Sequence, residues 1–199
     1  MTIAVIIPVL NEARCLAHTL AHTATLGFGE VIIVDGGSSD ESCTIVQSFA
    51  DRSGTLPSPT TGSMRLLAAS RGRARQLNAG AAASRCDVLL FLHADTLLPT
   101  NARQAVSIAL SDAACVGGRF NVRFDSSRMS ARVISSLMNL RSRWSGIATG
   151  DQAMFMTRMV FDGVGGFPDQ ALMEDIELSK RLLSRSRPAC IHHCVSTSG

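Results

Sequence analysis

The sequence contains little that would tie it to a membrane span, a nucleic acid or a secretory route. Its longest apolar runs, residues 31–34 and 88–92, are far shorter than the roughly 20 residues that a helix needs to cross a bilayer. The formal net charge is only +3, and the basic residues are scattered, which argues against nucleic acid as a partner. No basic segment or cleavage site precedes the first apolar run. We therefore expect a cytoplasmic protein, and peripheral contact with a membrane stays open.

Familiar cysteine and phosphate-binding motifs are missing too. The six cysteines form no CxxC pair, so we expect reduced thiols rather than a disulfide framework. The glycines at 36 and 37 are not part of a GxxxxGK[ST] motif, which excludes a P-loop. No GxGxxG follows the first apolar run, which argues against a dinucleotide-binding fold.

The chain of 199 residues has the size of one domain, and 46% of it is hydrophobic, enough for a sizeable core. Apolar, β-branched runs predict strands at 3–8, 31–35, 64–69, 87–92 and 115–124. Helices are predicted at 11–23, 41–49, 72–83, 101–110, 129–143 and 173–183, with a loop at 53–63 and a strand–turn mixture at 150–166. Strands apolar on both faces that alternate with helices predict a doubly wound α/β fold with a mostly parallel sheet.

Polar residues follow three of the predicted strands. Pro8 ends the first and Glu12 follows it, Asp35 ends the second, and His93 and Asp95 follow the fourth. Ligands of open parallel sheets bind beyond the carboxyl ends of the strands, so these residues are expected to meet in one crevice. Taken by itself, Asp35 is slightly better explained as the start of a turn or a helix cap.

Asp95 and His93 are candidate metal ligands. Mg²⁺ and Mn²⁺ prefer oxygen ligands and often bind through one or two carboxylates plus substrate phosphates. His93 lies on the same face of an extended chain as Asp95 and could be a second ligand or a phosphate contact. A purely structural histidine is an equally good interpretation.

Two helix starts carry further candidates. Arg73 and Asn78 lie in the segment that opens the helix at 72–83, where free N–H groups and the helix dipole suit an anion. Glu174 and Asp175 open the last helix after a glycine-rich segment. Acids at a helix start need no function, because they suit the dipole, but a mobile catalytic base would have the same pattern.

Taken together, these segments are far more specific than any one of them. Residues 6–12 (IIPVLNE), 34–40 (VDGGSSD), 91–96 (FLHADT) and 173–175 (MED) occur in this order at suitable separations. The chain resembles the family 2 glycosyltransferases with the GT-A fold along nearly its whole length. It is most similar to a bacterial subgroup that carries GRARQLNAGA, found here at 72–81, and FLHADT.

The resemblance implies an inverting transfer of a sugar from a nucleotide diphosphate sugar, assisted by Mn²⁺ or Mg²⁺. Pro8, Glu12 and Asp35 would line the nucleotide pocket together with Arg73 and Asn78. These five residues are therefore the expected nucleotide-binding set.

The same resemblance implies the catalytic residues. Asp95 would hold the metal on the diphosphate, with His93 beside it, and Asp175 would be the catalytic base. Asp151 and Glu174 would lie on the acceptor side.

The sequence also departs from the family pattern. The segment from His93 to Asp95 has one acid where the family has two, and relatives continue past the end of this chain, so we expect one domain, residues 1–199, truncated at its C-terminus. A nucleotide-sugar-binding protein without turnover therefore stays an alternative. A sugar nucleotidyltransferase is the other, and it ranks low because no glycine-rich loop follows the first strand. The sequence leaves the acceptor open.

Overall fold

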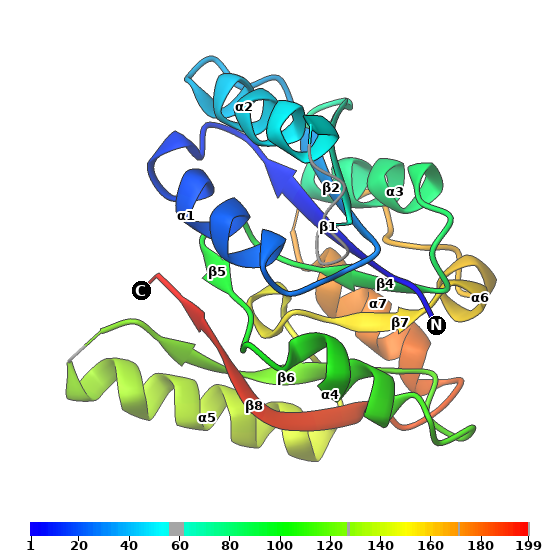
Figure 1. Ribbon diagram of the computed structural model, residues 1–199. Helices are drawn as coiled ribbons and strands as arrows, with labels where there is room; N and C mark the ends of the chain where they lie inside the picture. The colour runs from blue at the N-terminus through cyan, green and yellow to red at the C-terminus, as the bar shows by residue number, and fades with distance from the viewer. Residues whose placement is uncertain (56–61, 127, 171, 199) are drawn as a thin grey trace.

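The computed structural model describes residues 1–55, 62–126, 128–170 and 172–198. Within these residues, eight strands form one twisted sheet in the order β3-β2-β1-β4-β7-β6-β8-β5, and Figure 1 shows the helices arranged around it. The strands are β1 (Ile3–Val9), β2 (Glu30–Asp35), β3 (Ser63–Ala68), β4 (Val88–Phe91), β5 (Thr96–Leu97), β6 (Gly117–Phe124), β7 (Phe155–Thr157) and β8 (Ala189–Thr197).

Helices cover both faces of this sheet. They are α1 (Ala13–Ala24), α2 (Ser42–Thr55), α3 (Arg73–Ala83), α4 (Ala102–Ala109), α5 (Met129–Ser145), α6 (Arg158–Gly163) and α7 (Glu174–Leu183), with a short 3₁₀ turn, η1 (Gly150–Gln152). Alternate residues of β1 enter two separate cores: Val5 and Ile7 pack with α1, α2 and α4, and Ala4 and Ile6 pack with α3, α6 and α7. The predicted α/β fold with helices on both faces is confirmed.

The first four long strands form the parallel half that the sequence predicts. β1 pairs in parallel with β2 on one side and with β4 on the other, and β3 extends the sheet beyond β2. The order of these strands reverses direction between β1 and β4, which is where open α/β sheets bind their ligands. Of the predicted loop at 53–63, residues 53–55 belong to α2 and 56–61 lie outside the described residues.

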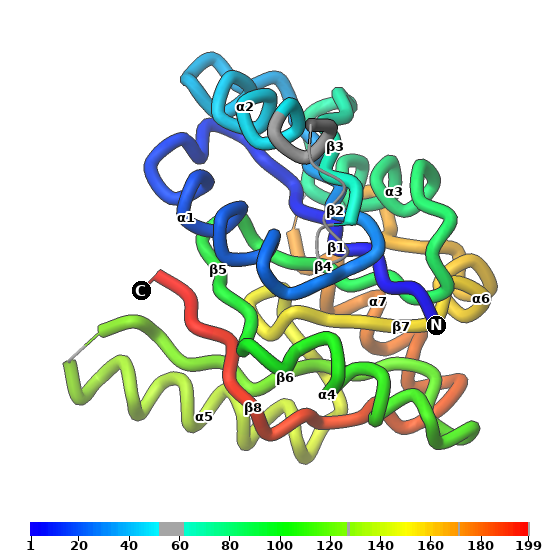
Figure 2. Tube along the Cα trace, in the orientation of Figure 1, coloured from blue at the N-terminus to red at the C-terminus, as the bar shows by residue number. Residues whose placement is uncertain are grey.

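The second half of the sheet is mixed, and its details differ from the prediction. Residues 150–166 resolve into η1, β7 and α6, and β7 runs antiparallel to both β4 and β6. The pattern of residues 189–197 does not predict a strand, but β8 pairs in parallel with β6 along most of its length. The end of β8 then pairs with β5, Thr197 opposite Thr96, and Figure 2 shows this last segment returning toward β5.

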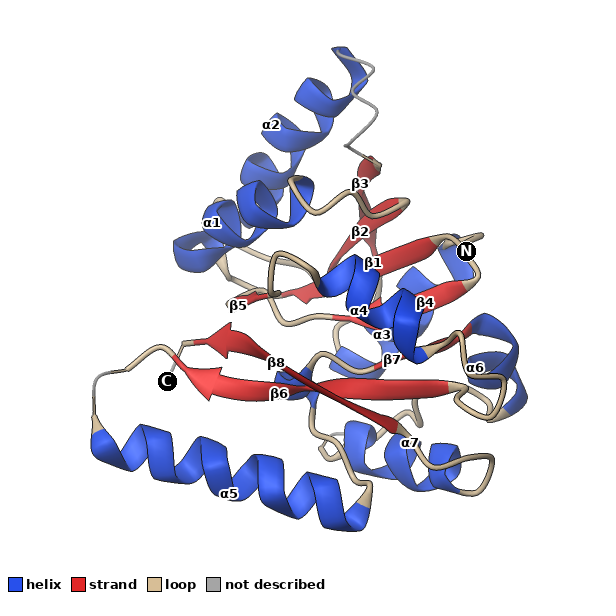
Figure 3. Ribbon diagram, turned by 60° about the horizontal axis from the view of Figure 1, so that its bottom comes forward, coloured by secondary structure: helices blue, strands red, loops and turns tan. Residues whose placement is uncertain are grey.

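Helix α5 lies on the outside of this second half. Figure 3 shows it beneath β6, on the side of the sheet opposite to α4. Asn139 fixes the contact, because its side chain both accepts from the backbone N–H of Val122 (2.9 Å) and donates to the carbonyl of Val122 (2.9 Å). None of the helices in the described residues is long and apolar enough to cross a membrane.

Candidate functional site

The ends of β1 and β4 enclose an open pocket of about 240 Å³. Its walls are Pro8 near the end of β1, Glu12 after β1, His93 and Asp95 after β4, and Arg73 from the first turn of α3. The structure therefore brings together five of the residues that the sequence indicates, at the predicted edge of the sheet.

A second, smaller pocket lies next to the first and shares Arg73 and His93 with it. Gly150 and Asp175 complete its polar side, and apolar side chains close the rest: Leu77, Phe91, Leu92, Met154 and Phe167. The segment after β4, the start of α3, the turn η1 and the start of α7 are far apart in the sequence but meet here.

Arg73 is held between two neighbours. Its Nε lies 3.3 Å from Oε1 of Glu174, a carboxylate that is only 5% exposed, and its terminal nitrogen contacts Nε2 of His93. A guanidinium carries only donors, so Nε2 of His93 must accept. The ring proton therefore sits on Nδ1, which faces Oδ1 of Asp151 at 3.1 Å. Asp151, His93, Arg73 and Glu174 thus form one polar network across the site, in which the link between Arg73 and Glu174 is an ion pair.

This network of side chains determines the charge of Asp151. The hydrogen bond from His93 holds the pKa of Asp151 below its usual value, and the positive charge of Arg73 acts in the same direction. Partial burial of the carboxylate works the other way but is outweighed. Asp151 is therefore ionised at neutral pH and fixes the tautomer of His93.

Asp175 is oriented by the backbone. Its Oδ2 accepts the N–H of Gly150 at 2.6 Å, and its Oδ1 accepts the N–H of Ile176 at 2.7 Å. A carboxylate has about four lone-pair sites, so both oxygens keep the capacity to accept another proton donor. The geometry presents Asp175 to the pocket as a fixed acceptor.

Asp95 is the carboxylate best suited to a metal ion. Among the described residues its oxygens accept hydrogen bonds from the hydroxyls of Thr96, Thr197 and Ser198, and no basic side chain pairs with it. Both nitrogens of His93 are engaged, so His93 could ligate a metal only by releasing Arg73 or Asp151.

No group of three or more metal-ligating side chains gathers anywhere in the described residues. The charges nevertheless favour a cation. Arg73 is the one guanidinium in the walls of the two pockets, and it stands among the carboxylates of Glu12, Asp95 and Asp175. The residues fit a Mg²⁺ or Mn²⁺ ion that is held by Asp95 and completed by phosphate oxygens of a ligand.

Two of the predicted nucleotide-binding residues, Asp35 and Asn78, line neither of these two pockets. Asp35 is buried at the end of β2 and lines neither pocket; its carboxylate accepts the N–H groups of Gly37 and Ser38. Burial works to raise the pKa of Asp35, but the hydrogen bonds from Ser38 and Gly37 outweigh it and keep the pKa below its usual value. Asn78 exchanges two hydrogen bonds with the backbone of Phe167 and so holds the segment before α7.

Sequence reasoning missed Gln76 as a support of this edge. Its buried side chain donates to the carbonyl of Val9 (2.8 Å) and to that of Val34 (2.8 Å), where β1 and β2 end. Its amide also fills the space beside Gly36, where an added Cβ would meet it at 2.9 Å. One signal in the sequence could have identified Gln76. It is a polar residue on the inward face of an alanine-rich helix, one turn after Arg73.

The comparison with protein families settles the relationship of the chain. The model of the family described as glycosyl transferase family 2 matches residues 4–165. The chain belongs to this family. It is also 28% identical, over 196 aligned residues, to the probable glycosyltransferase YdaM of Bacillus subtilis. That match covers 90% of this chain and 46% of YdaM, so the chain spans less than half of that relative.

Solved structures show the same GT-A fold. TarS of S. aureus (residues 1–349) has a TM-score of 0.76 at 13% identity, covering 100% of this chain and 60% of TarS. The mannosyltransferase PcManGT of Pyrobaculum calidifontis has a TM-score of 0.73 at 21% identity, and the match covers 98% of this chain and 56% of PcManGT. Glucosyl-3-phosphoglycerate synthase of Mycobacterium tuberculosis has a TM-score of 0.67 at 17% identity, and the match covers 98% of this chain and 70% of the synthase.

Proposed function

We propose that residues 1–199 form a glycosyltransferase domain that moves a sugar from a nucleotide diphosphate sugar to a hydroxyl or carboxyl group of an acceptor, with inversion and with the help of a divalent metal. Family membership supports the reaction class. Among the neighbours with the same fold, PcManGT was solved with GDP-Man and Mn²⁺, and TarS with UDP-GlcNAc.

One observation carries the proposal. Arg73 and His93 belong to both pockets, with Glu12 and Asp95 on one side of them and Gly150 and Asp175 on the other. A donor whose diphosphate lies at Arg73 can therefore have its leaving group beside Asp95 and its sugar beside Asp175. Separate places for the leaving group and the attacking oxygen are what a single displacement requires.

The chain's own residues would bind and orient the donor. Pro8 and Glu12 would line the side of the pocket that takes the nucleotide. Arg73, fixed by His93 and Glu174, would contact the diphosphate. A divalent ion at Asp95 would supply a Lewis acid that neutralises charge on the departing nucleoside diphosphate. Asp35 would act indirectly, by shaping the turn after β2.

Asp175 would act as the general base. For a hydroxyl acceptor, it would accept the hydroxyl proton as the acceptor oxygen attacks the anomeric carbon from the face opposite the diphosphate and the nucleoside diphosphate leaves. The N–H of Gly150 holds Oδ2 in place, so the unshared lone pairs of the carboxylate stay turned to the pocket. Asp151 and Glu174, the two predicted acceptor-side residues, would serve by fixing His93 and Arg73.

The first test measures binding. We expect nucleoside diphosphates and their sugars to raise the melting temperature of the protein, and Mn²⁺ to increase that rise. Asp95→Asn should remove the effect of Mn²⁺ and leave part of the metal-free shift. Asp162→Asn, a change of an exposed acid on α6, is the matched control. No stabilisation by any of these ligands would contradict the proposal.

The second test separates transfer from mere binding. Asp175→Asn should keep the donor-linked shift in melting temperature while donor turnover falls by roughly 10²-fold or more. Turnover can be followed as donor hydrolysis when no acceptor is at hand. Unchanged turnover in Asp175→Asn would remove this residue from the mechanism. Tight binding without turnover in the unaltered chain would favour a nucleotide-sugar-binding protein instead.

A further inference from the structure

Helix α5 carries an apolar stripe on the face that it turns to solvent. The stripe consists of Met129, Val133, Leu137, Leu140 and Trp144, spaced three or four residues apart. Each is at least 45% exposed, and Trp144 is 80% exposed. At 3.6 residues per turn, side chains with this spacing lie in one row along the helix.

The opposite face of α5 makes the contacts that hold the helix to the protein. Ser135 and Ser142 are the buried residues of α5, and Met138 packs against the hydrophobic core of the sheet. Asn139 adds the paired hydrogen bonds to β6. The apolar stripe is therefore not needed to bind α5 to the rest of the chain, and its exposure calls for a different explanation.

Arginines flank the stripe on both sides. At 100° per residue, Arg132 and Arg143 lie beyond one edge of the row and Arg141 beyond the other. Residues 126–150 contain no Asp or Glu. Within the described part of the chain, none of the α5 arginines is ion-paired.

Arg119 adds to the positive charge from below. It is 2% exposed, and its hydrogen bonds among the described residues go to the carbonyls of Phe120 and Asn139, to the amide oxygen of Asn121 and to the Cys190 sulfur, not to a carboxylate. The outer surface of α5 thus combines an apolar row, positive charge at both edges and no acid on the helix.

We propose that α5 is a membrane-binding surface, which lies in the plane of a bilayer that contains anionic lipids. The apolar row would enter the boundary between headgroups and acyl chains, and the arginines would reach the anionic headgroups beside it. Charge complementarity selects this occupant. A second copy would bring two arginine-flanked rows together, and like charges would then oppose the contact.

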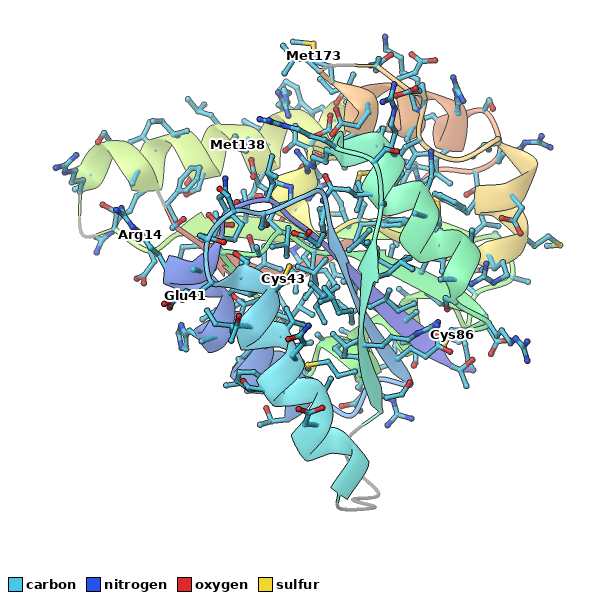
Figure 4. All side chains as sticks on the ribbon, turned by 90° about the horizontal axis from the view of Figure 1, so that it is seen from above. Arg14, Glu41, Cys43, Cys86, Met138 and Met173 are labelled. Atoms are coloured by element: carbon cyan, nitrogen blue, oxygen red, sulfur yellow. The ribbon has the colours of Figure 1, made fainter. Side chains whose placement is uncertain are left out.

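The surface has a direct connection to the candidate site. α5 ends at Ser145, and the segment that follows leads within five residues to Gly150, whose N–H holds Asp175. Figures 3 and 4 show α5 and α7, whose start Met173 marks in Figure 4, along the same margin of the molecule. A bilayer bound to α5 would therefore lie near the pocket, although lipid binding itself does not depend on the proposed sugar transfer.

Trp144 allows a test without any label, because it is the one tryptophan of the chain and the chain has no tyrosine. We expect its fluorescence to shift to shorter wavelengths with vesicles of equal parts phosphatidylcholine and phosphatidylglycerol, and not with phosphatidylcholine alone. Lipids brominated in the acyl chain should quench it, since an interfacial helix buries its apolar face by about 5–10 Å. High salt should weaken binding.

Variants separate the two contributions. Each arginine removed should weaken vesicle binding about fivefold, so that Arg132→Gln/Arg141→Gln/Arg143→Gln loses about a hundredfold. Leu137→Ser should lose roughly tenfold through the apolar contact. All changes are at exposed positions, so circular dichroism should be unaltered.

Matched controls lie on α4, across the sheet from α5. Ile108→Ser removes an apolar side chain that is 64% exposed, and Arg103→Gln removes an exposed charge. Both should bind vesicles as the unaltered chain does.

Three results would overturn the proposal. The first is the absence of any change in Trp144 emission with anionic vesicles, and the second is equal loss of binding in the α4 controls. The third is a dimeric mass with Trp144 already shielded from a water-soluble quencher before lipid is added, which would assign the stripe to a second copy.

Discussion

Gly150→Ala offers a sharp test of the contact between Arg73 and His93 at the candidate site. A Cβ at this position would overlap the terminal nitrogen of Arg73 and Nε2 of His93, the two atoms that contact one another. The φ of Gly150 is not in the left-handed region, so alanine adds only this steric conflict. The backbone N–H that holds Asp175 is retained.

We expect Gly150→Ala to weaken ligand binding more than it lowers the free energy of unfolding. The Arg73 side chain is 37% exposed, so its end can swing toward solvent, and we expect the free energy of unfolding to drop by no more than about 2 kcal/mol. Loss of one hydrogen bond to a charged group costs about 1.5–3 kcal/mol. Affinity for a nucleoside diphosphate should therefore fall about ten- to hundredfold.

The assay is titration calorimetry with UDP and GDP, in parallel with urea unfolding. Gly163→Ala is the matched control, because a Cβ there meets nothing within 4 Å. Arg73→Ala and the double variant with Gly150→Ala complete a cycle. If the added methyl group acts through Arg73, the double variant should bind no more weakly than Arg73→Ala alone.

A folded Gly150→Ala variant that binds nucleoside diphosphates as tightly as the unaltered chain would refute this role of Arg73. Fully additive losses in Gly150→Ala and Arg73→Ala would refute it as well, because Gly150 would then act by another route. A comparable loss in Gly163→Ala would show that any added methyl group disturbs binding.

Two further predictions concern stability. Gly80→Ala should lower the free energy of unfolding by about 1–3 kcal/mol in urea titrations, because its Cβ would lie 2.5 Å from Ile6 and 2.9 Å from Val34; an unchanged midpoint would contradict the close packing of α3. Because the pKa of Asp151 is lowered in the folded protein, its ionised carboxylate stabilises the fold at pH values above the ordinary carboxyl pKa. This stabilisation is lost as the pH falls through the lowered pKa. Asp151→Asn should therefore be less stable near neutrality, and the difference should vanish in acid; a pH-independent difference would exclude the charge of the Asp151 carboxylate as its cause.

The first half of the fold could be predicted because its strands are short, β-branched and buried on both faces. Residues 31–35, for example, can hardly be anything but a central strand between helices. β8 was missed because its pattern is irregular: three consecutive residues, His192, His193 and Cys194, are exposed. A register shift interrupts its pairing with β6 near this point. Such a strand is specified by the partner it pairs with rather than by its own periodicity.

The candidate site divides in the same way. Asp95 and Asp175 could be placed because one ends a buried strand and the other opens a helix, which are local features. The partners of His93 could not, because Arg73 and Asp151 come from segments 20 residues before it and 58 after it. For Asn78, a polar residue near a helix start, the sequence predicts a ligand contact, and it could not show that the amide is hydrogen-bonded to the backbone of Phe167.

The segment from His93 to Asp95 contains one acid where the family pattern has two, and the contacts of His93 give a physical reason for this difference. A second carboxylate at position 93 would also accept a hydrogen bond from Arg73, but it would add a negative charge where Glu174 already pairs with that arginine. A neutral imidazole accepts the same hydrogen bond without that charge, and Asp151 keeps it in the accepting tautomer. Under the proposed function, the cleft would therefore repel a diphosphate less than it would with two acids there, and Arg73 would carry more of the charge compensation that a metal would otherwise supply alone.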